Sequence, residues 1–523
     1  MPNAAQKKSE TVPAPRVGMV SLGCVKNLAD AEVMLGSLMA DGIEITNEPS
    51  EADALIVNTC SFINSAQEES VEAILESSEL RAVQRPGQAL IVSGCLPQRF
   101  RKELPELMPE VDAFMGVDQI AEVSRIIREA IDCRSKKTKN PKDEYSNKNT
   151  KIVPLAEINS RPRYIPDVQT PRFRLTPSHF AYVKIAEGCN HPCSFCIIPR
   201  MRGIHRSRQQ TDIVEEAKGL IAQGVKELNL ISQDSTYYGM DLVPGNRRGN
   251  SSPGKFSAAN ASLPPNASTL CSLLRELNQI PGDFWIRLLY THPAHWTDEL
   301  IQTIAECSKV ARYVDMPLQH IHDTMLERMR RETDGQYIHD LIARIREGIP
   351  GIAIRTTFIV GFPGETDKRF EALVDFIRET KFERLGVFSY SKEEGTRAGG
   401  MRGQVSEKVK EDRCARAMGE QKKIARSMGK ALKNKKLKVI AEKMVTDKLL
   451  KGADVRSWEY GLARDGDRKG PKFAADQYTV SRGEADAPDI DGRVYVRGEL
   501  PLGDFSWVRI IGHTDYDLIA EPV

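Results

Sequence analysis

Short apolar runs, each followed by a polar and helix-forming stretch, recur along the first part of this chain. The runs VGMVSLG, ALIVNT and ALIVSG have the length of a strand and are rich in β-branched residues. Strand–helix units joined by right-handed crossovers form a parallel sheet whose strand ends all point one way. The pattern therefore predicts an N-terminal α/β domain, which we bound at residues 16–132.

The same alternation of strand and helix returns at residue 175 and continues to residue 405. The predicted strands are AYVKIA, ELNLIS, WIRLLY, YVDMP, IAIRTTFIVGF and RLGVFSY. Strands in βα order predict a partial (βα) barrel, with the chemistry at the carboxyl ends of the strands by analogy with full barrels. Residues 241–268 are rich in Gly, Asn, Ser and Pro, and we expect them to form a disordered insertion.

Three further segments differ from these α/β regions in composition. Residues 133–174 are charged and poor in apolar residues, which predicts a polar linker. Residues 406–430 are basic and helix-forming, which favours a solvated helix between domains over a dedicated RNA contact. Residues 431–523 contain short β-like runs between Gly and Asp turns, which predicts a small β-barrel. Within residues 441–523, acidic residues outnumber basic ones, which argues against a grip on phosphates.

The composition of the whole chain limits the functional classes. A length of 523 residues fits about three domains. A net charge of +2 does not suggest a general nucleic-acid binder. We find neither an apolar leader nor an apolar run of membrane-spanning length, and ten cysteines fit a reducing compartment, so we expect a cytoplasmic protein.

Three cysteines lie close together in the segment EGCNHPCSFC, residues 187–196. Cys189, Cys193 and Cys196 have the spacing C-x-x-x-C-x-x-C, with no fourth cysteine nearby. A closed structural zinc site normally takes four ligands, so half of a zinc knuckle fits poorly. A cubane cluster held by three thiolates instead keeps one iron open. The spacing therefore predicts a 4Fe-4S cluster with an open iron.

A second set of cysteines follows the three N-terminal apolar runs. Cys24, Cys60 and Cys95 are separated by 36 and 35 residues. Ligands of open α/β sheets gather at the carboxyl ends of the strands, so we expect these thiols on one edge. Unrelated core thiols would explain one such cysteine more easily than three. The pattern predicts a second cluster, again with one open iron.

The two cysteine sets and several longer strings resemble the radical SAM methylthiotransferases, which use S-adenosylmethionine (SAM). That family combines an N-terminal cluster domain, a radical SAM core and a C-terminal TRAM domain, and the resemblance covers nearly all of residues 17–523. The strings resembling its ribosomal-protein branch, the RimO type, are SLGCVKNLADAE, LISQDSTYYG, DMPLQHIHDTMLERMRR, FSYSKEEGTRA and EADAPDIDGRVYV. The transfer-RNA branch usually has a glutamine–methionine pair where this chain has Val25 and Lys26.

The resemblance implies a transferase that methylthiolates the β-carbon of an aspartate in small-subunit ribosomal protein S-twelve. It implies two 4Fe-4S clusters, a sulfur donor and two SAM molecules, one as methyl donor and one as radical source. The implied partners are the ribosomal protein and an electron donor such as flavodoxin or ferredoxin, without a membrane or a nucleic-acid substrate. The cofactors would supply the difficult chemistry, and the protein would position them.

Five residues are candidate contacts of SAM, and no catalytic side chain is expected beyond the cluster ligands. Phe195 precedes the last core cysteine, in the position that the family uses against the cofactor. Gly361 and Gly364 lie in GFPGET, a turn whose backbone could approach the adenine closely. Arg287 and Gln319 lie at predicted strand ends and could contact the ribose or the carboxylate, although structural polar roles fit the pattern equally well.

Two alternatives to this function remain open from the sequence. One is a transfer-RNA adenosine methylthiotransferase, against which the acidic last domain and the LGCVKN string argue. The other is a non-enzymatic iron–sulfur or RNA-binding protein, which would not need two sets that stop at three cysteines. If the substrate is the ribosomal protein, we expect Asp486, Asp489 and Asp491 to steer association with that basic protein, unless they only close a turn.

Overall fold

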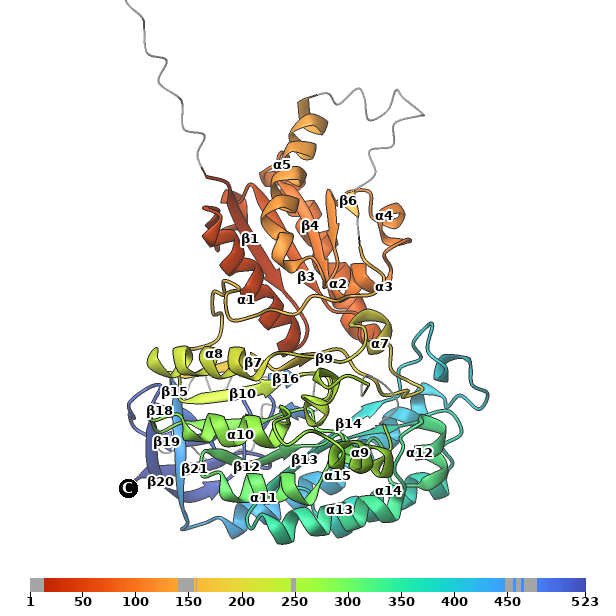
Figure 1. Cartoon of the computed structure of the whole chain (residues 1–523), viewed down its shortest axis with the longest axis vertical. Helices are drawn as coiled ribbons and strands as arrows, with labels where there is room; N and C mark the ends of the chain where they lie inside the picture. The colour runs from red at the N-terminus through yellow and green to blue at the C-terminus, as the bar shows by residue number, and fades with distance from the viewer. Residues whose placement is uncertain are drawn as a thin grey trace, which may run out of the picture. The chain divides into compact units, whose positions relative to one another are not determined.

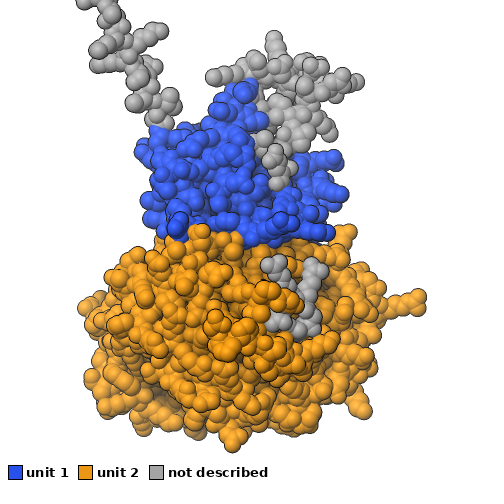
Figure 2. Space-filling model, in the orientation of Figure 1, with its two compact units in different colours: residues 1–164, 169–173 blue, residues 165–168, 174–523 orange. Residues whose placement is uncertain are grey.

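The computed structural model describes residues 14–139, 155–156, 158–245, 251–446, 455–457, 462–464 and 477–523 (Figure 1). The chain divides into two compact units, coloured separately in Figure 2. Unit 1 comprises Met1–Tyr164 with Gln169–Phe173, and unit 2 comprises Ile165–Val168 with Arg174–Val523. No helix among the described residues is long and apolar enough to cross a membrane.

Unit 1 contains a six-stranded parallel sheet with the strand order β2-β1-β3-β4-β5-β6. Its strands are β1 (Arg16–Ser21), β2 (Glu44–Ile45), β3 (Ala54–Thr59), β4 (Ala89–Gly94), β5 (Ala113–Met115) and β6 (Leu155–Ala156). Its helices are α1 (Val25–Ala40), α2 (Asn64–Gln84), α3 (Cys95–Arg99), α4 (Leu104–Leu107) and α5 (Val123–Lys139), with short 3₁₀ turns η1 (Pro49–Glu51) and η2 (Ile120–Glu122). The predicted N-terminal α/β fold is confirmed.

Helices cover both faces of this sheet, which explains why β3 and β4 are buried along their whole length. Alternate residues of a strand point to opposite faces. Ile56 of β3 therefore joins the apolar cluster that contains residues of α1 and α5, whereas its neighbours Leu55 and Val57 join the cluster that contains Ile74 of α2. A parallel strand that is buried on both sides has a continuous apolar run in its sequence, as β3 and β4 do in their ALIV segments.

The predicted polar linker at residues 133–174 differs from the structure in part. Helix α5 continues to Lys139, and β6 adds a sixth strand beside β5. Arg172 forms an ion pair of 2.5 Å with the buried carboxylate of Glu32. Segments of this stretch therefore belong to unit 1, because a strand and a buried charge pair hold them there; the remaining charged residues 140–154 lie outside the described residues.

The core of unit 2 is a second six-stranded parallel sheet, with the order β14-β13-β12-β11-β10-β7. Its strands are β7 (Phe180–Lys184), β10 (Glu227–Ile231), β11 (Trp285–Leu288), β12 (Val310–Asp315), β13 (Ala353–Val360) and β14 (Arg384–Ser389). The main helices are α8 (Gln210–Ala222), α10 (Leu270–Gln279), α11 (Asp298–Glu306), α12 (Asp323–Met329), α13 (Gly335–Gly348) and α14 (Asp367–Thr380). All of them contribute buried residues to the apolar cluster that contains the sheet, α12 through Leu326 alone. The predicted six βα strands and partial barrel are confirmed.

The predicted disordered insertion at 241–268 is wrong for much of its length. Residues Pro253–Ala261 form helix α9, which follows the 3₁₀ turns η3 (Ser235–Tyr237) and η4 (Met240–Leu242). Phe256 is buried and packs with Tyr237 and Met240. One aromatic side chain in an otherwise polar stretch thus anchors the helix, an effect that composition alone does not reveal. Residues 246–250 lie outside the described residues.

Helix α15 (Glu407–Ala431) leads from the core to the C-terminal domain and packs against α14 and β14. The strands β15 (Lys436–Thr446), β18 (Gln477–Gly483), β19 (Val494–Arg497), β20 (Phe505–His513) and β21 (Leu518–Pro522) then form a closed barrel. A separate two-stranded ribbon contains β16 (Val455–Ser457) and β17 (Leu462–Arg464). The predicted small β-barrel is confirmed. A helix lies where one was predicted between the domains, but it is not solvated throughout, because Ala417 and Ile424 are buried in the apolar cluster of the core.

Buried charges join the C-terminal barrel to the amino-terminal ends of the core strands. Glu227, the first residue of β10, pairs with Arg287 of β11 at 2.6 Å and also with Arg482 of the barrel. All three side chains are buried. Breaking such a pair by removing one partner is strongly destabilising, because the other charge stays buried and unpaired.

The segment from Glu484 to Gly492 in the barrel makes further contacts of this kind. Asp486 pairs with Arg384, and the Asp491 carboxylate accepts a hydrogen bond of 2.7 Å from the Tyr313 hydroxyl. Asp486 and Asp491 are buried, so the expectation that they steer a ribosomal protein is wrong. Their charges are used inside the chain, and only Asp489 between them is exposed.

Candidate metal centres and cofactor site

The cysteines of unit 1 lie at the carboxyl ends of three neighbouring strands. Strands β3 and β4 pair in register up to Thr59 and Gly94, so Cys60 and Cys95 follow at the same level. Cys24 caps the amino-terminal end of α1, three residues after β1 ends. Parallel pairing of β1 with β3 and of β3 with β4 thus brings the three cysteines to one edge, as predicted.

The buried side chain of Asn27 connects the three strand ends. Its amide nitrogen donates hydrogen bonds to the carbonyls of Leu22, at 3.1 Å, and Thr59, at 2.7 Å. Its oxygen lies 3.8 Å from the Cys95 sulfur. Gly23 has a left-handed backbone (φ +84°), and a side chain there would collide with Cys60. The residues flanking all three thiols are therefore packed around one amide.

The core cysteines lie in one loop after β7, beyond the short strand β8 (Ala186–Glu187). Burial raises the pKa of the Cys189 thiol well above its usual range, and the charges of Asp234 and Cys193 add to this. Burial, followed by the charge of Cys193, also raises the pKa of Cys196 to about 12. Thiols that disfavour each other's ionisation lie close together, and iron ions would reverse this preference because coordinated thiols are deprotonated. The loop thus fits the predicted cluster.

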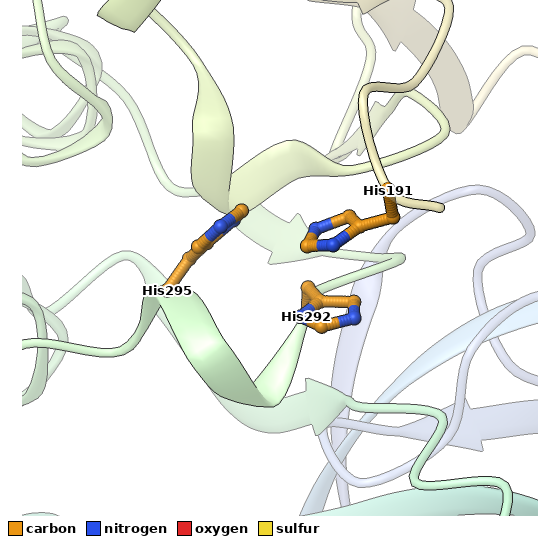
Figure 3. Close-up of side chains that lie close together, drawn as sticks. All are labelled: His191, His292 and His295. Carbon is orange, nitrogen blue, oxygen red and sulfur yellow. The ribbon is translucent and has the colours of Figure 1, made fainter. Parts of the chain in front are cut away.

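Three histidines gather beside this loop, and they are close enough together to suggest a metal ion. Ligand nitrogens of His191, His292 and His295 lie within 4.8 Å of one another, and all three side chains are buried (Figure 3). The rings of His191 and His292, however, are stacked with centroids 3.5 Å apart and planes at 14°. A metal ion lies in the plane of each imidazole that binds it, and near-parallel stacked rings do not share such a point. The stacking therefore argues against a metal site.

A carboxylate explains the histidine group better. Asp234 follows β10 and lies 3.0 Å from Nε2 of His191 and 2.9 Å from Nδ1 of His295. Its other oxygen accepts hydrogen bonds from the amide and hydroxyl of Thr236. Burial alone would raise the pKa of Asp234, but His295 and His191 outweigh it and hold that pKa well below its usual range. Asp234 thus anchors His191, which lies between two of the core cysteines.

Four of the five candidate SAM contacts come together at the carboxyl end of β13. Phe195 packs against an apolar cluster that contains Phe362 and Tyr390. Gln319 pairs with β13 through its backbone, where its carbonyl accepts a hydrogen bond of 2.9 Å from the Ile359 amide. Its φ of +73° is uncommon for a residue other than glycine, and such strained positions cluster at functional sites.

The GFPGET turn also begins at this end of β13, and it needs both of its glycines. Gly361 and Gly364 have left-handed backbones, with φ of +70° and +85°. A side chain at Gly361 would collide with Lys410 of α15, and one at Gly364 would crowd Arg328. Glu365 fixes the turn by accepting a hydrogen bond of 2.6 Å from the Gly361 amide. The side of Gly361 that a larger residue would occupy is therefore filled by the protein.

Arg287, the fifth candidate, does not join this group. Its Nε donates to Glu227 at 2.6 Å, and its Nη1 donates to the carbonyl of Glu484 at 2.7 Å. These contacts place its guanidinium at the junction with the C-terminal barrel. Arg287 is therefore not grouped with the other four candidates, since its Nε and Nη1 are engaged at the opposite end of the strands from Phe195.

Family models match three parts of the chain. One described as "Uncharacterized protein family UPF0004" matches residues 16–116, the Radical SAM superfamily matches residues 183–377, and the TRAM domain matches residues 469–523. Among solved structures, a radical SAM methyltransferase, TsrM from Kitasatospora setae, is similar with 15% identity, covering 72% of this chain and 75% of that one. Its TM-score of 0.46 gives it no weight in the argument.

Full-length relatives are more informative. A protein of Opitutus terrae named ribosomal protein uS12 methylthiotransferase RimO is 52% identical over 97% of this chain and 96% of its own length. A protein of the same name from Akkermansia muciniphila is 47% identical over 97% of this chain and 99% of its own length. The chain belongs to this methylthiotransferase family. It is a radical SAM enzyme, and this superfamily implies SAM and a 4Fe-4S cluster.

Several residues that hold these methylthiotransferase sites were not found from the sequence. Asn27 and Asp234 have no distinctive spacing relative to the cysteines they support. Glu365 lies in the GFPGET motif, yet its buried pairs with His320, at 3.1 Å, and Arg413, at 2.7 Å, depend on residues 45 and 48 positions away. The motif signalled the turn, but no local pattern signals such distant partners.

Proposed function

We propose that this chain methylthiolates the β-carbon of an aspartate in ribosomal protein uS12, the small-subunit protein named S-twelve above. The observation that carries the proposal is the 52% identity to the Opitutus terrae protein across almost the whole of both chains. The two sets of three cysteines, each gathered at the end of a parallel sheet, support the same chemistry.

The cysteines of unit 1 are proposed to hold a second 4Fe-4S cluster. Cys24, Cys60 and Cys95 provide three thiolates, so one iron would remain open to bind the sulfur that is transferred. Asn27 would keep the three strand ends together around that cluster through its bonds to Leu22 and Thr59. All ten cysteines lie in the described part of the chain, and none of them forms a disulfide there.

The core loop and the end of β13 are proposed to bind SAM. The cluster and SAM together supply a radical that removes hydrogen from an unactivated carbon. Phe195 and the neighbouring Phe362 offer apolar surface that excludes water from the cofactor. Gln319, Gly361 and Gly364 are proposed contacts, the glycines through backbone groups that Glu365 holds in place.

Two further proposals follow from a ribosomal substrate. The protein would act in the cytoplasm, where ribosomes are assembled and work. It would receive its electrons from a small reductant protein such as flavodoxin or ferredoxin, because the reaction needs an external electron for each SAM that is cleaved.

Mass spectrometry of ribosomal proteins and transfer RNA from a deletion strain tests the proposed substrate. We expect uS12 to lose a methylthio mass increment, and the wild-type chain to restore it where Cys193→Ala does not. Loss of a methylthio group from transfer RNA, with uS12 unchanged, would instead establish the transfer-RNA activity.

A further inference from the structure

The carboxyl end of helix α12 holds the core cysteine loop. The amide of Ser194 donates a hydrogen bond of 2.9 Å to the carbonyl of Met329, and its hydroxyl donates one of 2.8 Å to the carbonyl of Arg328. The carbonyls at the end of a helix have no partners within the helix. Here two of them accept hydrogen bonds from Ser194, which follows Cys193 directly.

The chain turns back towards the loop directly after α12. Arg330 caps the helix in the left-handed conformation (φ 55°), which is unfavourable for a residue with a side chain. The next amide, that of Arg331, donates to the carbonyl of Leu326 at 2.8 Å. This turn places the side chain of Arg331 against the cysteine loop.

The guanidinium of Arg331 is held from two sides. Its Nη2 donates a hydrogen bond of 2.7 Å to the carbonyl of Pro317, and its Nη1 lies 3.6 Å from the sulfur of Cys193. The residue is 7% exposed, so water screens its charge little.

We propose that Arg331 sets the reduction potential of the cluster at Cys189, Cys193 and Cys196 by donating a hydrogen bond to the Cys193 sulfur. Hydrogen bonds to the sulfurs, net charge and solvent exposure are what tune such potentials. The reduced cluster carries one more negative charge than the oxidised one, so a fixed cation and donor stabilise the reduced form. Arg331 thereby makes the cluster easier to reduce. Arg331 is a positioning residue, and the inference rests on the proposed function only for the presence of this cluster.

Asp234 also carries a charge near the cysteine loop, but unlike Arg331 it is paired with ionisable side chains. His191 and His295 face that carboxylate at 3.0 and 2.9 Å, so its charge is shared with two imidazoles. Within the part of the chain that the structure describes, Arg331 forms no ion pair with a carboxylate. Of these two groups, the guanidinium is therefore the one expected to act on the cluster as a full charge.

The test compares three variants by potentiometric titration of the reconstituted cluster, followed by electron paramagnetic resonance. The full chain carries Cys24→Ala, Cys60→Ala and Cys95→Ala, so that only the core cluster contributes. Arg331→Gln removes the charge, Arg331→Lys keeps it, and Arg330→Gln removes a neighbouring charge that is exposed to solvent. We expect the midpoint potential to fall in Arg331→Gln, to fall less in Arg331→Lys, and to stay unchanged in Arg330→Gln.

An unchanged potential in Arg331→Gln, or an equal fall in Arg330→Gln, would overturn the inference. If Arg331→Gln does not retain iron, Arg331→Lys decides. Lysine keeps the charge but cannot donate to Pro317 and Cys193 from one planar group. Absence of a cluster from the background protein itself would contradict the proposed function instead. In that case the same titrations with all six cysteines present decide the role of Arg331.

Discussion

The two sets of cysteines occupy equivalent places in two parallel sheets, yet different parts of the fold position them. In unit 1 each cysteine follows its own strand, so the register of β1, β3 and β4 determines where the thiols lie. In unit 2 a single loop contains all three, and backbone carbonyls of α12 and the Asp234 side chain after β10 hold it. A site made by a sheet needs little further support, whereas a site made by a loop depends on its neighbours.

The largest effect should come from removing the thiolates themselves. Anaerobic reconstitution should load about eight irons, since each cubane needs its own three cysteines. Replacing Cys24, Cys60 and Cys95 with Ala should halve that content and leave SAM cleavage intact, whereas Cys193→Ala should abolish deoxyadenosine formation. Iron analysis and chromatography of the nucleoside products measure both results. Full iron content in the triple variant would disprove the second cluster.

Asp234→Asn should weaken iron binding at the core loop and leave the unit 1 site unchanged, although Asp234 itself binds no iron at either site. Its carboxylate anchors His191, so its loss should loosen the core loop alone. Changes in groups that orient metal ligands typically weaken metal binding about tenfold, and we expect a loss of that order here. Chelator competition monitored by absorbance measures the loss. Asp298→Asn, at a side chain that is 85% exposed, is the matched control. Equal loss of iron from both sites would contradict the comparison.

Asn27→Ala should have the corresponding effect in unit 1, but on stability. It leaves the carbonyls of Leu22 and Thr59 without their partner, at a cost of about 1–3 kcal/mol in the free energy of unfolding. Denaturant unfolding of the iron-free protein measures that cost, with the exposed Asn47→Ala as control. A stability equal to that of the control would mean that sheet register alone holds the cysteine edge.

Gly361→Ala should have the smallest effect and should leave both clusters in place. The left-handed backbone opposes a side chain by about 1 kcal/mol, and the flexible Lys410 side chain would have to move. We expect SAM affinity to fall a few-fold, as measured by equilibrium binding. Gly351→Ala is a matched control, because Gly351 is also left-handed (φ +80°) but faces open space. Unchanged affinity would remove the GFPGET turn from the SAM site.

The features that could be predicted from the sequence differ between the two cysteine sites. The strands, and with them the cysteine edge of unit 1, were visible because apolar runs mark buried parallel strands locally. The core cysteines were visible through their spacing, but not Asp234 or Arg331, which approach them only in the folded chain.

The errors share one physical cause, which is that partners distant in sequence decide burial. Asp486 reads as a surface residue until Arg384, 102 positions earlier, is placed beside it. Arg287 resembles a ligand contact until Glu227 and Glu484 occupy its donors. Phe256 gives order to a stretch whose composition predicts none, because Tyr237 and Met240 provide a surface for it.

The buried charges between the core strands and the Glu484–Gly492 segment bear on how the molecule melts. Detaching the barrel would take Arg482 and the Glu484 carbonyl away from Glu227 and Arg287, and would expose the buried amino-terminal ends of the core strands. Core and barrel should therefore unfold in one cooperative transition, and a chain cut after α15 should aggregate rather than persist as a shorter enzyme. The C-terminal domain is then required for the stability of the core, and it is not a module that can be removed without unfolding the rest.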